Sequence, residues 1–185
     1  MKTKVIIFLS VLLFAMQWAI PLKMIYDSEN VLISGKAYRF KTQPIDPTDP
    51  FRGAFIILNY EIRSFPTDNS DWAYNEEVYV SIKEDSLGFA KAVGINKERP
   101  IDTDDYVTAY TRDYYNGVLN FHLPFDRFYM EETKAYDAEL AYLKAQRDTI
   151  ANNSFALVYV KKGNAVLADV LVNGSSVVKL NSTKD

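Results

Sequence analysis

The sequence predicts a β-rich α+β fold, in which antiparallel hairpins and a meander form a sheet or a partly open barrel with one packed helix, preceded by one transmembrane helix. Three observations support this prediction. The chain holds 13 Tyr and 11 Phe among 185 residues, and aromatic side chains suit the pleated, half-buried surface of a sheet. Tight-turn dipeptides recur between alternating apolar and polar segments. The chain also opens with a long uncharged, apolar run.

The N-terminal run has the properties of a membrane anchor. Residues 1–4 form a short basic lead, and residues 5–22 carry no charge and only two strongly polar side chains, Ser10 and Gln17. A helix needs about 17 to 25 apolar residues to cross a bilayer, so this run is long enough. Trp18 lies near its end, where an indole suits the membrane interface. We therefore predict a transmembrane signal-anchor at residues 5–22.

A cleaved signal peptide is the alternative to an anchor. Cleavage needs a small-residue A-x-A site after the apolar run, and here Gln17 stands two positions before Ala19. The missing site favours an uncleaved, single-pass membrane protein. By the positive-inside rule, the basic lead stays in the cytoplasm. Residues 23–180 then form an extracytoplasmic domain, periplasmic in a Gram-negative bacterium, and residues 181–185 form a polar tail.

Several short strands are expected in the first half of this domain. Residues 31–42 contain an alternating segment typical of a strand. Residues 43–50 hold three prolines, which exclude both a helix and a central strand. Residues 55–62 read FIILNYEI, which predicts one strand with apolar side chains on both faces at its start. Shorter alternating segments predict further strands at residues 77–82 and 89–95.

Tight turns organise the second half of the chain. Asn and Gly adopt the positive backbone angles that two-residue hairpin turns require. Such turns are predicted at Asn116-Gly117, Gly163-Asn164 and Asn173-Gly174, the last two joining their strands into a meander. One helix beyond the anchor is expected at residues 134–148, where apolar side chains recur at helical spacing. That helix would pack against the sheet.

The chain offers few groups for catalysis. It has no cysteine and one histidine, His122, so thiolate nucleophiles, Cys-ligated metals and His-based triads have almost nothing to use. Hydroxyl and amine groups lie two residues apart at Ser34 and Lys36, and again at Ser81 and Lys83. Such spacing is common, and neither pair stands beside an oxyanion loop. We therefore predict no catalytic residue.

Acidic residues are the remaining candidates for a metal site. The Asp-rich stretches 68–71 and 102–105 offer oxygens, but neither continues into the glycine and terminal glutamate of a calcium loop. Glu131 and Glu132 suit the start of the predicted helix, where negative charge is favourable. No metal or cofactor is expected. Two of the 21 basic residues precede position 23 and all 24 acidic residues follow it, so the domain carries a net charge of −5. That charge argues against nucleic acid as a partner.

One stretch, residues 45–60, reads IDPTDPFRGAFIILNY and resembles the signature of the GDYXXLXY family of bacterial membrane-anchored proteins. That signature is Gly-Asp-Tyr followed by spaced Leu and Tyr, usually preceded by Asp-Pro-x-Asp-x-x-Arg. The matching residues are Asp46, Pro47, Asp49, Arg52, Gly53, Leu58 and Tyr60, with Phe55 replacing the first Tyr. Residues 127–132 and 165–174 are similar to the family in order and spacing, so the resemblance covers about residues 35–174.

The resemblance implies that the chain has an N-terminal anchor and accompanies a multi-pass membrane protein. It implies no activity, because the family has none assigned. Ala54 replaces the family's Asp. If that acid were catalytic, this chain would have lost it, so either the acid is structural or this member is inactive.

The residues themselves favour a structural motif. Asp46 and Asp49 are placed to accept turn amide hydrogen bonds, and Arg52 has the planar guanidinium that bridges two carboxylates. Gly53 permits a bend into the following strand. Leu58 and Tyr60 of the motif lie on the same face of the predicted strand, so we expect both side chains in the core.

These inferences predict a non-enzymatic domain that serves as a binding or accessory subunit of a multi-pass membrane or envelope protein. Two alternatives remain open. One is an envelope hydrolase that uses a Ser–Lys pair. The other is a small-ligand-binding module whose aromatic-rich β layer encloses a pocket.

Overall fold

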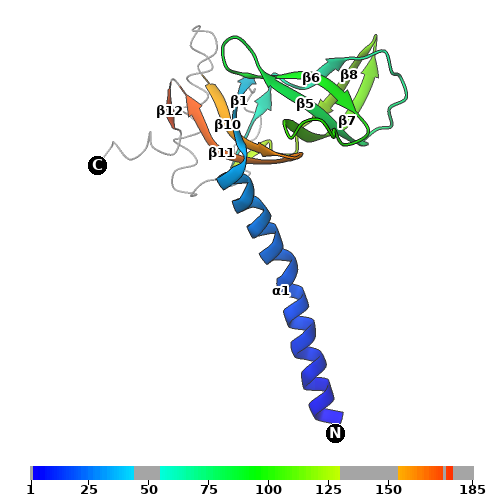
Figure 1. The fold of residues 1–185 in the computed structure, drawn as a ribbon, viewed down its shortest axis with the longest axis vertical. Helices are drawn as coiled ribbons and strands as arrows, with labels where there is room; N and C mark the ends of the chain where they lie inside the picture. Colours follow the sequence, from blue (N-terminus) through cyan, green and yellow to red (C-terminus); the bar gives the residue numbers. More distant parts are fainter. Residues whose placement is uncertain (1, 44–54, 130–153, 173, 177–185) are drawn as a thin grey trace.

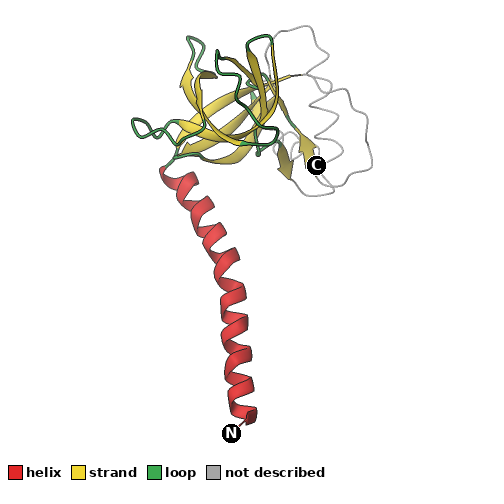
Figure 2. Cartoon of the chain, turned by 90° about the vertical axis from the view of Figure 1, so that its right-hand side faces the viewer, coloured by secondary structure: helices red, strands yellow, loops and turns green. Residues whose placement is uncertain are grey.

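A computed structural model describes residues 2–43, 55–129, 154–172 and 174–176 of the chain. One long helix, α1 (Lys2–Ser34), leads into a β domain and projects from it as a single rod (Figures 1 and 2). The predicted β-rich class is confirmed: the described strands form two five-stranded antiparallel sheets and one two-stranded sheet around one core. The helix predicted at residues 134–148 lies outside the described residues, as does the proline-rich stretch 44–50.

The apolar run of the sequence forms most of α1. Every large apolar side chain from Val5 to Ile25 for which burial is described is at least 55% exposed, so none of them packs on the domain. By length and composition, α1 is sufficient to cross a membrane. Its 33 residues correspond to about 50 Å, against about 30 Å for the hydrocarbon core of a bilayer. The helix continues through residues 31–34, so the strand expected within residues 31–42 begins only at Lys36.

The first sheet has the strand order β12-β11-β10-β1-β3. Its strands are β1 (Lys36–Gln43), β3 (Asn59–Tyr60), β10 (Ser154–Lys161), β11 (Asn164–Val172) and β12 (Ser175–Ser176). All neighbouring strands are antiparallel. The β10–β11 turn is Lys162-Gly163, with φ angles of 50° and 86°, and not the predicted Gly163-Asn164. Lys162 adopts the left-handed backbone conformation and forms the turn with Gly163, so Asn164 pairs with Lys161.

The second sheet has the strand order β4-β8-β7-β5-β6. Its strands are β4 (Ser64–Pro66), β5 (Glu77–Glu84), β6 (Ala90–Asn96), β7 (Tyr106–Tyr115) and β8 (Val118–His122). The predicted turn at Asn116-Gly117 is confirmed, with φ angles of 50° and 77°. The tip of the β5–β6 hairpin is fastened by Asp85, whose carboxylate accepts hydrogen bonds from the amides of Leu87 and Phe89 at 2.8 and 2.9 Å.

The strand predicted at residues 55–62 is wrong as one continuous element. The segment divides into β2 (Phe55–Ile57), which pairs with β9 (Arg127–Tyr129), and β3, which pairs with β1. The break falls at Leu58, whose amide donates to the Asp126 carbonyl at 2.7 Å. Alternation alone could not show this switch, because both halves keep the same side-chain parity.

Two contacts join the sheets into a nearly closed barrel. Gly163, at the β10–β11 tip, exchanges backbone hydrogen bonds with β7, donating to the Tyr106 carbonyl and accepting from the Thr108 amide at 3.1 and 3.0 Å. At the other seam, the Arg39 guanidinium donates to the Leu87 and Gly88 carbonyls at 2.9 and 3.0 Å. The core between the sheets includes Tyr38, Phe40, Val78, Val80, Ile82, Val107, Leu119, Phe121, Val158, Val160 and Val170.

Candidate binding groove

The second half of the family-like motif lies in the core. Leu58 and Tyr60 are 3% and 5% exposed, and the Tyr60 hydroxyl donates to the Phe125 carbonyl at 2.8 Å. The rings of Phe40, Tyr60 and Phe125 pack against one another with centroids 5.4 to 5.7 Å apart. Phe55 begins β2. The other motif residues, Asp46, Asp49, Arg52 and Gly53, lie outside the described residues, as does Ala54.

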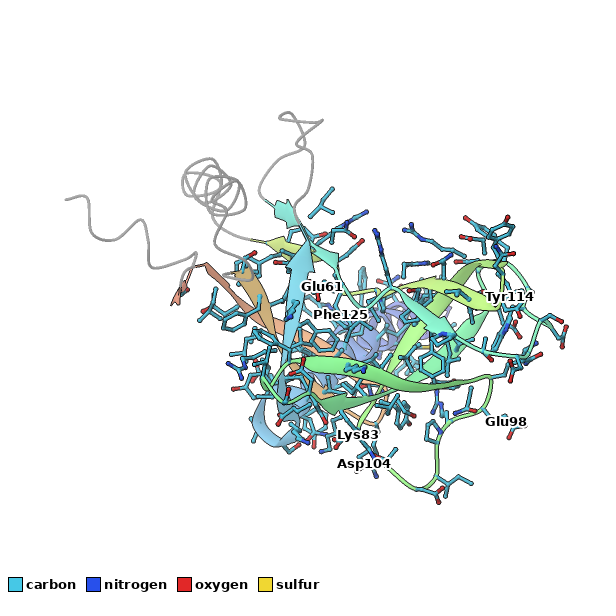
Figure 3. All side chains as sticks on the ribbon, turned by 90° about the horizontal axis from the view of Figure 1, so that it is seen from above. Glu61, Lys83, Glu98, Asp104, Tyr114 and Phe125 are labelled. Carbon is cyan, nitrogen blue, oxygen red and sulfur yellow. The ribbon has the colours of Figure 1, made fainter. Side chains whose placement is uncertain are left out.

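A groove of about 500 Å³ opens beside this aromatic cluster. Its wall combines the segment from Ile57 to Arg63, part of β7 and the end of β8, and buried side chains such as Leu58, Phe121 and Leu123 back it. Figure 3 views the domain from above, with Glu61 and Phe125 labelled close together and Tyr114 labelled at the far end of the second sheet. The sequence did not indicate this groove, because its wall is assembled from segments about 60 residues apart.

A β-bulge in β7 shapes one side of the groove. The pairing of β7 with β8 runs from Thr111 opposite Phe121 to Tyr114 opposite Leu119. Two β7 residues, Arg112 and Asp113, therefore face the single residue between those partners on β8. A bulge turns side chains away from the regular alternation of a strand, and both bulge residues line the groove and are exposed.

The charged side chains of the groove differ in whether they have partners. The Asp113 carboxylate accepts a hydrogen bond from Asn120 Nδ2 at 2.8 Å, and Asp126 lies 4.0 Å from Arg127 Nε. The guanidinium groups of Arg63 and Arg112 make no hydrogen bond or ion pair with any described residue. The four charged side chains sum to a formal charge of zero, but the two that lack a partner among the described residues are both cations.

The single histidine also lines this groove. His122 is half-buried, and its ring stacks on Tyr110 with centroids 5.5 Å apart. Its Nδ1 atom is buried without a hydrogen-bond partner in the described part of the chain. Among the described residues there is no group of three or more His, Asp or Glu side chains that could hold a metal ion.

The Ser–Lys pairs suggested by the sequence do not come together as pairs. Lys36 Nζ lies 3.3 Å from the Asp105 carboxylate, and the nearby Tyr38 hydroxyl and that carboxylate raise the pKa of Lys36. A raised pKa keeps the amine protonated, whereas a general base must be neutral. Ser34 instead donates to the Asn30 carbonyl and accepts from Lys161 Nζ, both at 2.6 Å.

The second such pair is equally separate. Ser81 is half-buried on β5 and Lys83 is exposed on the same strand, and no hydrogen bond joins them in the described structure.

Both Asp-rich stretches form turns closed by their own side chains. In the first, Asn69 Oδ1 accepts from the Asp71 amide at 3.0 Å, and the Asp71 carboxylate pairs with Lys97 at 3.2 Å. In the second, Thr103 Oγ1 accepts from the Asp105 amide at 3.0 Å. Glu131 and Glu132 lie outside the described residues.

Comparison with known proteins gives one relationship. No curated protein and no solved structure is significantly similar to this chain. The family model described as GDYXXLXY protein matches residues 17–170, which takes in the second half of α1 and nearly all the described strands. The match covers well over half of the chain, and the protein therefore belongs to the GDYXXLXY family.

Proposed function

We propose that this chain is a membrane-anchored, non-enzymatic binding domain that lies outside the cytoplasm as an accessory subunit of a multi-pass membrane or envelope protein. The observation that carries the proposal is the junction between α1 and the barrel. A helix whose large apolar side chains are exposed from Val5 to Ile25 needs a lipid environment. In this chain that helix also has a fixed attachment to the domain.

The junction contains no flexible linker. Val31 in the last turns of α1 is 3% exposed, and the Gly35 amide donates to its carbonyl at 2.8 Å. Lys161 Nζ on β10 donates to Asn30 Oδ1 at 3.2 Å and to the Ser34 hydroxyl. A side chain on Gly35 would place its Cβ only 2.4 Å from the Val31 carbonyl oxygen, so glycine is required for this close approach.

The helix also sets the height of the domain above the membrane. If residues 5–22 span the bilayer, residues 23–34 continue as a helical stalk of about 18 Å. A stalk with a rigid end holds the barrel at one height and in a narrow range of orientations. Such pre-organisation favours binding to a neighbour in the same membrane, because less orientational freedom is lost on association.

Crosslinking of the full-length chain in native membranes, followed by mass spectrometry, tests the proposal. We expect crosslinks to a multi-pass membrane protein or another envelope component. A Gly-Ser-Gly-Ser insertion between Ser34 and Gly35 should keep the anchor and the fold but reduce these crosslinks, whereas the same four residues added after Asp185 should not. Recovery of the chain only as a lone monomer would count against an accessory role.

The orientation has its own test. Lys2 and Lys4 precede the apolar run and would remain in the cytoplasm. Protease added to spheroplasts should therefore degrade the residues after Leu22, and alkaline carbonate should leave the full-length protein in the membrane. Release by carbonate would show that the chain is not anchored by an uncleaved helix.

A further inference from the structure

We propose that the groove between β7, β8 and the Ile57–Arg63 segment binds a soluble small organic anion, with its carboxylate or phosphate group between Arg63 and Arg112 and its apolar part against the wall. This inference goes beyond the proposed function, because it concerns a soluble ligand and not the membrane partner. It rests on charge, on the placement of the two arginines and on the shape of the groove.

The charge argument comes from the partners of the four charged lining residues. Asp113 and Asp126 already face a donor or a cation, at 2.8 Å and 4.0 Å respectively. Arg63 and Arg112 have no partner among the described residues. A guanidinium presents planar, paired donors that match the oxygens of a carboxylate or a phosphate. The groups left without a partner therefore select an oxyanion.

The strand pairing places the two arginines on opposite sides of strand β8. Arg63 directly precedes Ser64, which pairs with Asn120 on β8, and Arg112 is one of the two bulge residues that oppose Asn120 from β7. Two strand spacings separate their backbones by about 10 Å. That separation lets two long side chains approach a common anion from opposite sides, and the Arg63 carbonyl is held by the Phe121 amide at 2.9 Å.

The shape of the groove suits a ligand larger than an inorganic ion. Its volume of about 500 Å³ lies within the 300 to 1,000 Å³ range typical of small-molecule sites. Ile57, Ile62 and Leu123 contribute apolar wall, and Asn59 and Asn120 add uncharged polar groups. A few polar groups on an apolar wall are typical of sites that orient a small molecule.

The chain carries its own reporter for this site. His122 is the only histidine in the sequence and lines the groove, so its ring gives a single, unambiguous set of NMR signals. Full-length protein in nanodiscs of neutral lipid would be titrated with phenyl phosphate and with benzoate, and benzamide would serve as the uncharged control. We expect saturable shifts of the His122 signals with both anions and none with benzamide.

Variants separate the two arginines from general electrostatics. Arg63→Gln and Arg112→Gln should each weaken binding about tenfold, the effect of one lost charge-assisted hydrogen bond. Both side chains are exposed, so these changes should leave the fold intact. Lys91→Gln removes one positive charge from an exposed position on β6 outside the groove and should leave the affinity unchanged.

Several results would overturn the inference. These are the absence of saturable shifts at millimolar anion, equal shifts with benzamide, and equal weakening by Lys91→Gln and the two arginine variants. An anionic lipid headgroup offers the same phosphate chemistry. If nanodiscs of anionic lipid shift the His122 signals without any added probe, the occupant is a headgroup and the soluble-ligand assignment is wrong. None of these results depends on the partner crosslinks, so each proposal can fail alone.

Discussion

Gly163, at the β10–β11 tip, closes one seam of the barrel, and Gly163→Ala should destabilise the protein strongly. Gly163 has a φ angle of 86°, and an added Cβ would lie 2.8 Å from Tyr106 Cε2 and 3.0 Å from Thr108 Oγ1. The Tyr106 ring is 5% exposed and packs edge-on against Tyr79 at 5.8 Å, so it has little room to move. The alanine methyl would therefore push the hairpin away from β7.

Gly117→Ala is a matched control for the cost of the backbone conformation. Gly117 has a φ angle of 77° in the β7–β8 turn, and nothing lies within 4 Å of an added Cβ. A non-glycine residue at positive φ costs about 1 to 2 kcal/mol. Overpacking at a buried contact adds about 1 to 3 kcal/mol. Gly163→Ala should therefore lower the free energy of unfolding by about 2 to 5 kcal/mol, and Gly117→Ala by about 1 to 2 kcal/mol.

Urea unfolding of the full-length protein in detergent, followed by the far-ultraviolet circular dichroism of the strands, measures both changes. Linear extrapolation converts the shift in midpoint into a free energy when the slope is unchanged. Equal destabilisation by the two substitutions would refute the reasoning, because it would mean that contact between the hairpin tip and β7 contributes nothing beyond the turn itself.

Three further predictions test the core, the pH response and the motif by the same unfolding measurement. Tyr60→Phe should cost about 1 to 2 kcal/mol, because it leaves the buried Phe125 carbonyl without its donor. The control Tyr74→Phe, at an 83% exposed position, should change stability little. Equal effects of the two substitutions would contradict a stabilising role for the Tyr60 hydrogen bond. Hydrogen bonds from backbone amides lower the pKa of Asp85 in the folded protein. The contribution of Asp85 to folding stability is therefore fully present above the ordinary carboxyl pKa, and it is lost as the pH falls through the lower pKa of the folded state. Asp85→Asn should therefore flatten the acid side of the stability profile, and an unchanged profile would exclude this role. If Arg52 bridges Asp46 and Asp49, as the sequence predicts, Arg52→Lys should cost about 1 to 3 kcal/mol, since lysine cannot copy a bidentate contact. Unchanged stability with lost partner crosslinks would place Arg52 on the binding surface.

Local chemistry explains which strands could be predicted from the sequence. The β7–β8 hairpin follows from Asn116-Gly117, because both residues tolerate the positive φ angles that they adopt. The β10–β11 turn was misplaced by one residue, because a lysine adopts a φ angle of 50° where asparagine was expected to do so. At that tip, the backbone bonds from Gly163 to β7 fix the turn. Those contacts come from a distant strand and have no signal in the local sequence.

The candidate groove could not be predicted for the same reason. Arg112 and Asp113 stand in a strand with no glycine or proline to mark a bulge, and the irregularity is visible only in the pairing with β8. The sequence drew attention to serine, lysine and aspartate patterns, which the structure places in turns, on β5 and at the helix junction. The only sequence signal for Arg63 is its position shortly after the motif.

The position of the family-like motif in the fold explains its spaced Leu and Tyr, because the chain passes there from one sheet to another. Its spaced Leu and Tyr stand where the chain leaves β2 and enters β3. The Leu58 amide donates to the Asp126 carbonyl, and the Tyr60 hydroxyl donates to the Phe125 carbonyl one residue earlier. Leu58 and Tyr60 thus hold the carbonyl groups of two consecutive residues, Phe125 and Asp126, while burying their own side chains in the core. Replacement of the family's Asp by Ala54 leaves this pair of bonds intact, because neither bond uses the acid. The same pair also positions the wall of the groove, since Leu58, Tyr60 and Asp126 all line it. The fold and the groove therefore both require the Leu–Tyr spacing, whether or not the acid is present.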